Sequence, residues 1–179
     1  MSRPARIRAY LEVPAANLRI PDETDFVDLE KDDPSAFLAA PGLALLGWEL
    51  LNRSADLAQL ADFSVTYLWR RKGGKSRGQL VYGRCQKPSG VLKHAIKSDF
   101  VVSLSADHCR DNGFGPQELT ALLFHELLHI SVGEDGKPKL VGHDFEGFTR
   151  EIAEFGLWRE SALEMARAMQ MALFEEGEK

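Results

Sequence analysis

The sequence predicts an α+β fold in a single domain, with a small antiparallel or mixed sheet packed against helices. The chain has 179 residues, which is enough for one hydrophobic core. Apolar residues make up 44% of it and charged residues 27%, as in ordinary globular proteins. Segments that alternate like strands lie between segments with the period of helices. We therefore expect one domain over residues 1–179, with its core at about 43–175.

The N-terminal third is expected to hold a strand, a long loop and a helix. Residues 6–13 alternate loosely before a proline and predict a short strand. Residues 14–33 are polar and acidic, which is typical of a loop or linker. A turn at residues 35–40 is expected to stop at Pro41-Gly42. Leucines at helical spacing then predict a helix over residues 43–60.

The middle of the chain has the composition of strands. Residues 64–70 and 79–85 contain β-branched and aromatic side chains, and the glycines between the two segments predict a hairpin. Residues 88–97 are expected to be irregular. The apolar residues 99–105 predict a strand, and an edge strand of this kind can pair with an extended peptide.

Three helices are expected in the C-terminal third. Pro116 can open the first of them, because its missing N–H costs nothing there. This helix is expected to run over residues 116–131, with Gly133 as its C-terminal cap. Further helices are expected at 145–155 and 158–174. The inward-facing residues of the first helix are Leu119, Leu122, Leu123, Leu127 and Ile130.

The sequence His125-Glu126-Leu127-Leu128-His129 lies inside this first helix. Residues four apart share one face of a helix, so both imidazoles can reach one zinc ion. Glu126 lies about 100° around the helix from His125 and can act as a base beside the metal instead of binding it. These polar residues would be costly to bury among leucines without a partner, which favours a metal site over a chance spacing.

A catalytic zinc ion needs a third protein ligand and an open position for water. His143 has the best ligand chemistry downstream of the motif, because imidazole suits zinc and the loop before His143 can fold back. The alternative interpretation of His143 is an ordinary surface histidine. Asp144 is expected to cap the next helix or to orient a histidine. The other candidate ligands are Glu146, Glu151, Glu154, His94 and His108.

Three segments carry a resemblance to a known family. They are residues 99–109 (DFVVSLSADHC), residues 125–130 (HELLHI) and residues 142–148 (GHDFEGF). Together they resemble the phage metallopeptidase domain family, and more distantly the SprT-like zinc peptidases. Members of the family carry a second acidic residue where this chain has Gly147, which leaves Glu146 alone.

The resemblance implies a zincin-like fold with an HExxH active-site helix. It implies a zinc ion bound by His125, His129 and His143, with Glu126 as the catalytic base. It also implies an origin in a phage or another mobile element.

The expected function is that of a zinc-dependent metallopeptidase, which hydrolyses peptide bonds through a zinc-bound water with Glu126 as general base. Its partner is then a protein or peptide substrate. The group that stabilises the oxyanion is left open among Arg150, Lys137, His108 and a backbone N–H. The alternative function is a zinc-stabilised, phage-encoded binding module without turnover. A zinc hydrolase of non-peptide amides is a third alternative.

Charge is unevenly distributed along this chain, whose net charge is −5. Residues 22–33 hold seven acidic side chains, whereas residues 63–98 hold nine basic side chains and no acidic one. The basic segment predicts either weak nucleic-acid contact through residues 70–97 or a solvated hairpin, and we favour the hairpin. The acidic run can pair with the basic segment inside the chain. The aromatic residues between the cations are Tyr67, Trp69 and Tyr82.

We expect a cytoplasmic protein of a bacterium or a bacterial host. No apolar run is long enough to cross a bilayer, so no membrane contact is expected. The N-terminus lacks the apolar region of a secretory signal. Cys85 and Cys109 are expected to be reduced thiols, with a disulfide between them left open.

Overall fold

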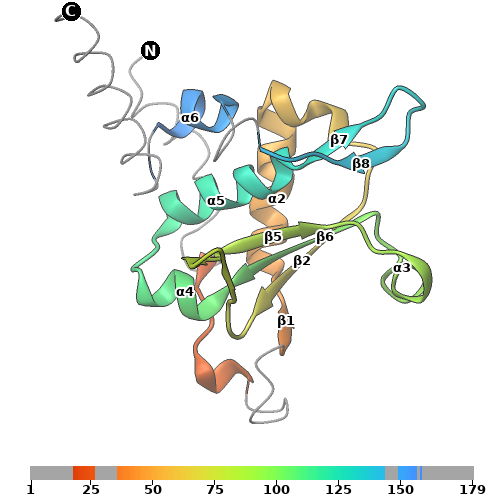
Figure 1. Cartoon of the computed structure of the whole chain (residues 1–179). Helices are drawn as coiled ribbons and strands as arrows, with labels where there is room; N and C mark the ends of the chain where they lie inside the picture. The colour runs from red at the N-terminus through yellow and green to blue at the C-terminus, as the bar shows by residue number, and fades with distance from the viewer. Residues whose placement is uncertain (1–17, 27–35, 144–148, 157, 159–179) are drawn as a thin grey trace, which may run out of the picture.

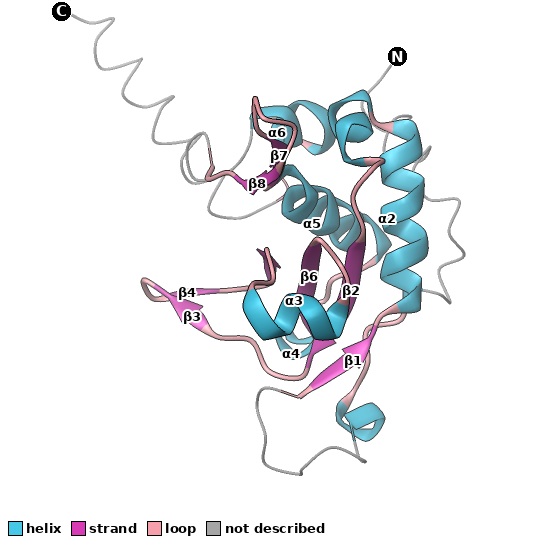
Figure 2. Ribbon diagram, turned by 90° about the vertical axis from the view of Figure 1, so that its right-hand side faces the viewer, coloured by secondary structure: helices cyan, strands magenta, loops and turns pink. Residues whose placement is uncertain are grey.

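A four-stranded sheet with helices on one of its faces makes up the fold (Figures 1 and 2). The computed structural model describes residues 18–26, 36–143, 149–156 and 158. The sheet order is β1-β2-β6-β5, with β2 and β6 parallel and the two outer pairs antiparallel. The predicted α+β class is therefore confirmed. The strands are β1 (Phe37–Ala39), β2 (Val65–Arg70), β5 (Gly83–Gln86) and β6 (Phe100–Ser105).

Helices α2 (Pro41–Arg53) and α5 (Pro116–Leu128) enclose the core with the sheet (Figure 2). α2 packs on β2, while α5 packs on β5 and β6. Gly47 allows the close approach of α2, because a Cβ atom there would come within 2.3 Å of the Tyr67 hydroxyl. The predicted burial of the inward-facing residues is confirmed for all five, although Ile130 lies in the strand that follows α5 and not in the helix.

The hairpin predicted from residues 64–70 and 79–85 is wrong, because β6 separates the two strands. All six residues of β6 are buried, and such an apolar strand is stable between two neighbours. The chain between β2 and β5 forms a smaller hairpin of β3 (Lys75–Ser76) and β4 (Gln79–Leu80). Its turn residues, Arg77 and Gly78, have φ values of 50° and 84°. A two-residue turn with two left-handed positions matches the twist of the flanking strands.

The helix predicted over residues 43–60 is confirmed only in its first part. α2 ends at Arg53, and a 3-10 helix, η3 (Ala55–Leu60), follows it. The prediction that Pro41 interrupts a turn is wrong: Pro41 opens α2, where proline fits the first helical turn. The preceding residues form β1 and pair with β2.

Two short helices were not predicted from the sequence. Residues 88–97, expected to be irregular, contain α3 (Gly90–Ile96). None of its residues is buried, so no apolar period marks it. α4 (Ala106–Asp111) directly follows β6, the strand that was predicted over residues 99–105.

α5 begins at Pro116, as predicted, but ends at Leu128 rather than at residue 131. The residues that follow form a hairpin of β7 (Ile130–Val132) and β8 (Pro138–Leu140). This hairpin replaces the predicted end of the helix and the loop after it. It turns the chain back towards the end of α5 (Figure 1).

α6 (Thr149–Phe155) lies within the helix predicted over residues 145–155. Gly156 ends it with a φ of 79°, as a glycine cap does. Three predictions fall outside the described residues: the strand at 6–13, the cap at Asp144 and, except for Trp158, the last helix.

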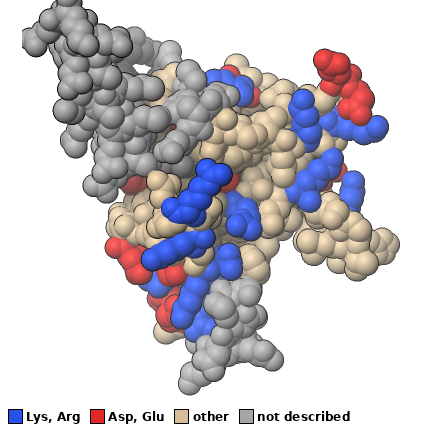
Figure 3. All heavy atoms as spheres, in the orientation of Figure 1, with Lys and Arg blue, Asp and Glu red and all other residues tan. Residues whose placement is uncertain are grey.

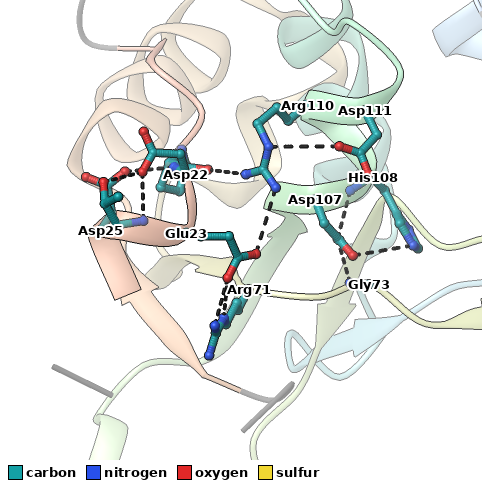
Figure 4. A network of polar contacts seen from close by, with 11 residues as sticks. Asp22, Glu23, Asp25, Arg71, Gly73, Asp107, His108, Arg110 and Asp111 are labelled. Carbon is teal, nitrogen blue, oxygen red and sulfur yellow. Dashed lines mark hydrogen bonds and ion pairs between the residues drawn. The ribbon is translucent and has the colours of Figure 1, made fainter. Parts of the chain in front are cut away.

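The acidic N-terminal region contacts the basic segment at Arg71. Glu23 begins the 3-10 helix η2 (Glu23–Phe26), and its carboxylate lies 2.8 Å from the Arg71 guanidinium (Figure 4). The predicted pairing within the chain is thus confirmed for these two residues. The acidic residues at positions 28–33 lie outside the described part of the chain.

Two smaller predictions concern the cysteines and the membrane. Cys85 and Cys109 are free thiols, and Cys109 is buried. None of the helices in the described ranges is long and apolar enough to cross a membrane.

Candidate metal centre

Helix α5 carries the first three residues of the candidate site. His125 and Glu126 lie in its last turn, and His129 follows in helical conformation. His125 and Glu126 are only 2% and 4% exposed. The start of the helix is set locally, since the Glu118 carboxylate accepts the Gly115 N–H at 2.9 Å. The sequence of α5 therefore determines both the helix and the face on which the histidines lie.

His143 reaches the same place because the β7–β8 hairpin returns the chain to α5. The Val141 N–H donates to the His129 carbonyl oxygen at 2.8 Å, two residues before His143. The Nε2 atoms of His143 and His125 are 3.0 Å apart. One ligand nitrogen from each of His125, His129 and His143 lies within 4.8 Å of the other two. The structure thus brings together the three histidines that the sequence indicated.

Hydrogen bonds hold two of these imidazole rings from their outer sides. The Glu151 carboxylate lies 2.5 Å from His125 Nδ1, and the Val141 carbonyl oxygen lies 2.8 Å from His129 Nδ1. Both oxygens accept, so Nδ1 carries the proton in each ring. The lone pair of each ring then lies on Nε2, which is the form of histidine that binds a metal.

The approach of His125 to His143 tests whether these residues fit a metal ion. The Nε2 atoms of these two rings are 3.0 Å apart, so either a proton of one ring or a cation lies between them. A tetrahedral ion with nitrogen ligands at 2.0–2.1 Å holds two of them about 3.3–3.4 Å apart. The distance in this chain is close to that value, so the three imidazoles fit a divalent metal ion.

Glu151 has a position that the sequence did not reveal. It is 3% exposed, and its second carboxylate oxygen accepts the Trp158 indole N–H at 2.6 Å. The sequence indicated Glu151 only as one candidate ligand among several. The single signal for its burial is its spacing of four residues from Phe155, which places both on one face of α6.

Glu126 lies where α5 meets β5. A Cβ atom at Gly83 would come within 2.4 Å of Glu126 Oε1, so only glycine leaves room for the carboxylate there. Burial raises the pKa of the Cys85 thiol, and the nearby Glu126 charge raises it further. Cys85 is therefore a neutral neighbour of Glu126 at physiological pH.

A cleft of about 340 Å³ opens over Glu126 and the histidines. β5 is the outer strand of the sheet in the described ranges, and its free edge borders this cleft. The edge strand expected at residues 99–105 is β6, which lies inside the sheet instead. The cleft is lined by Leu80, Val81, Tyr82, Gly83, Arg84, Cys85, Leu122, His125, Glu126, His129, Leu140, Val141 and His143.

The other candidate ligands lie away from the three histidines or outside the described residues. His108 bonds to the Val81 carbonyl oxygen at 3.0 Å and lies beside Asp107, which accepts the Gly73 N–H (Figure 4). His94 is exposed on α3, and Glu154 is half-buried on α6. Asp144, Glu146 and Gly147 belong to the part of the chain that is not described.

Two of the predicted oxyanion-stabilising side chains form ion pairs elsewhere. Arg150 lies 3.5 Å from Asp56, and Lys137 lies 3.1 Å from Asp135. Tyr82, which the sequence indicated only as an aromatic residue of the basic segment, lines the cleft. Its ring stacks on Phe114 at a centroid distance of 4.9 Å.

Comparison with known proteins gives one family. The model of a family described as "Putative phage metallopeptidase" matches residues 36–172. This range contains the sheet, α5 and all three histidines. No curated protein and no solved structure matches the chain.

Proposed function

Because the chain belongs to the phage metallopeptidase family, we propose that it is a zinc metallopeptidase that hydrolyses peptide bonds. The observation that carries this proposal is the convergence of three imidazoles beside a buried glutamate in an open cleft. The proposed metal ligands are His125, His129 and His143, and the proposed catalytic residue is Glu126.

The donor set supports zinc as the metal. Three neutral imidazoles are typical of catalytic zinc sites, which keep a fourth position for water. Calcium and magnesium prefer oxygen ligands, and the three converging groups here offer only nitrogen. The cleft over the histidines leaves the fourth position accessible to a substrate.

The position of Glu126 supports its role as general base. When bound, a zinc ion supplies a water of lowered pKa and polarises the carbonyl of the scissile bond. Glu126 takes a proton from the attacking water and returns it to the leaving amine. The backbone of β5 at Gly83 packs against the Glu126 carboxylate and keeps it beside the histidines. The burial of Glu126 strengthens the electrostatic interactions of this carboxylate.

The free edge of β5 supports a peptide as the substrate. An extended peptide can add to an exposed sheet edge through main-chain hydrogen bonds. β5 borders the cleft along Gly83–Cys85, next to Glu126. A peptide paired with β5 would therefore pass beside the proposed base and the histidines.

The experiment measures zinc content and proteolysis together. The purified protein is expected to hold one zinc ion and to cleave β-casein. Glu126→Gln should keep the zinc and lose activity by a factor of about 10²–10⁴, the usual contribution of a general base. His125→Ala should lose both. Glu134→Gln, on the exposed tip of the β7–β8 hairpin, is the matched control and should behave like the wild type.

The results separate this proposal from a binding module without turnover. Zinc retained by a wild type that cleaves neither β-casein nor a peptide library would indicate the binding module. A wild type without zinc would contradict both functions.

A further inference from the structure

One cation, Arg84, lines the cleft among the residues that the structure describes. The Lys87 ammonium group donates to the Pro138 carbonyl oxygen, which connects the end of β5 to β8. Figure 3 shows Lys and Arg side chains gathered near the centre of the view and at its right, with Asp and Glu side chains next to both groups.

The described lining of the cleft contains few carboxylates. Glu126 is the only carboxylate that lines the cleft in the described residues. Asp135, on the hairpin, already pairs with Lys137 at 3.1 Å. Arg84 forms no ion pair with any side chain that the structure describes. Among the described residues, the positive charge of Arg84 is therefore open to a ligand.

Side chains alternate between the two sides of β5, and this alternation determines which side chains of a bound peptide would lie near Arg84. Gly83 and Cys85 lie on the side of Glu126, so Arg84 and Gln86 lie on the opposite side of the strand. A peptide paired with the edge of β5 would place every second side chain on the side of Arg84. Directly opposed side chains of opposite charge stabilise a strand pair, and those of like charge destabilise it.

We propose that the substrate is an acidic polypeptide segment, bound in extended form with a carboxylate side chain opposite Arg84. This inference rests on the proposed function. Lys87, at the end of β5, adds positive charge near the same edge of the sheet.

Nucleic acid is the other polyanion that a basic rim attracts, and the structure favours the peptide. Single-stranded nucleic acid binds through bases stacked on aromatic side chains as well as through charge. Two of the three aromatic residues between the cations of the basic segment, Tyr67 and Trp69, are buried in the core and offer no surface for stacking. The third, Tyr82, already stacks one face of its ring on Phe114.

The first test measures binding with the Glu126→Gln protein loaded with zinc. Two fluorescent octapeptides are compared, one alternating Glu and Val and the other alternating Lys and Val. The Glu peptide should bind at least about fivefold more tightly at low salt, and the difference should shrink as salt is raised. Arg84→Glu should reverse the preference, whereas Lys93→Glu, on α3 outside the cleft, should leave it unchanged.

The second test maps cleavage by the wild type in a peptide library from a bacterial proteome. Asp and Glu should be enriched at alternate positions around the cleaved bonds. Cleavage without this enrichment would overturn the acidic substrate and leave the peptidase proposal standing. Salt-dependent binding of the Glu peptide without any cleavage would overturn the peptidase proposal alone. Displacement of the Glu peptide by lower concentrations of single-stranded DNA would assign the rim to nucleic acid and overturn the inference.

Discussion

At the scale of single residues, the orientation of His125 depends on a buried carboxylate. Glu151 bonds to His125 Nδ1 on one side and to the Trp158 indole on the other. A buried charge needs such partners, and here they also fix the imidazole ring. Trp158 in turn contacts Phe114 edge to face, with ring centroids 6.2 Å apart. Glu151 and Trp158 are therefore expected to position a metal ligand without touching the metal.

Replacing these positioning residues should weaken metal binding. Glu151→Gln is expected to lower zinc affinity by a factor of about 10–100, the usual effect of removing a partner of a ligand histidine. Trp158→Phe should lower the zinc affinity by a smaller factor, because the Glu151 carboxylate that bonds to His125 is still present. Competition with a chelating dye measures both. Trp48→Phe is the control, since Trp48 is 62% exposed on α2. Wild-type affinity in Glu151→Gln would contradict the positioning role.

Gly83 offers a second test at this scale. In Gly83→Ala the new Cβ atom would lie 2.4 Å from Glu126 Oε1, so the carboxylate or β5 must move. We expect a loss of peptidase activity with zinc retained, and a destabilisation of about 1–3 kcal/mol from overpacking. Gly74→Ala is the matched control, because nothing lies within 4 Å of its Cβ position. Equal activity in the two variants would mean that Gly83 does not hold Glu126 in place.

The sequence was informative about residues wherever spacing carries the geometry. His125, Glu126 and His129 follow from the period of one helix, and His143 follows from ligand chemistry. The link between Glu151 and His125 could not be predicted in this way. The two residues are 26 positions apart on different helices, and no pattern in the sequence indicates which carboxylate meets which ring.

At the scale of elements, the Asp99 side chain links the residues that directly precede the parallel strands β2 and β6. The Asp99 carboxylate accepts hydrogen bonds from the Ser64 N–H at 3.0 Å and the Ser64 hydroxyl at 2.9 Å. These bonds lower the pKa of Asp99. The ionised carboxylate is thus favoured in the folded protein over the unfolded chain, and it stabilises the register of the two strands.

Asp99→Asn should therefore cost stability in a pH-dependent manner. A carboxylate with a lowered folded pKa stabilises above its unfolded pKa of about 4, and loses this effect as pH falls through the folded pKa. At pH 7 the variant should be less stable than the wild type by about 1 kcal/mol. Urea unfolding at pH 7 and at pH 3 measures the difference, which should shrink at the lower pH. Asp62→Asn, nearby and exposed, should show no such pH-dependent difference.

Element types were easier to predict from the sequence than strand partners. The composition of β2 and β6 indicates strands, and the leucine period indicates α2 and α5. The single strand predicted over residues 79–85 is instead divided between β4 and β5. Pairing depends on which strand buries both faces, and the greater burial of β6 puts it between β2 and β5. The exposed helix α3 lacks an apolar stripe altogether, so periodicity could not reveal it.

At the scale of the whole molecule, the candidate site joins three separate parts of the chain. α5 supplies His125 and His129, the residues after the β7–β8 hairpin supply His143, and α6 supplies Glu151. Nothing in the fold of α5 alone requires the other two parts to lie against it. A metal ion held by all three histidines would therefore stabilise their assembly, because it binds the folded chain and not the separated segments.

Removing zinc from the whole protein should therefore lower its melting temperature. A ligand at 100 times its Kd contributes about 2.7 kcal/mol, which is about 5–10 °C for a chain of this size. Calorimetry of the protein with zinc and after EDTA treatment measures the shift, and a single transition is expected if residues 1–179 form one domain. His143→Ala should lose most of the shift, whereas His94→Ala, exposed on α3, should keep all of it. An equal zinc-dependent shift in the two variants would mean that His143 does not join the hairpin end to α5 through a shared metal ion.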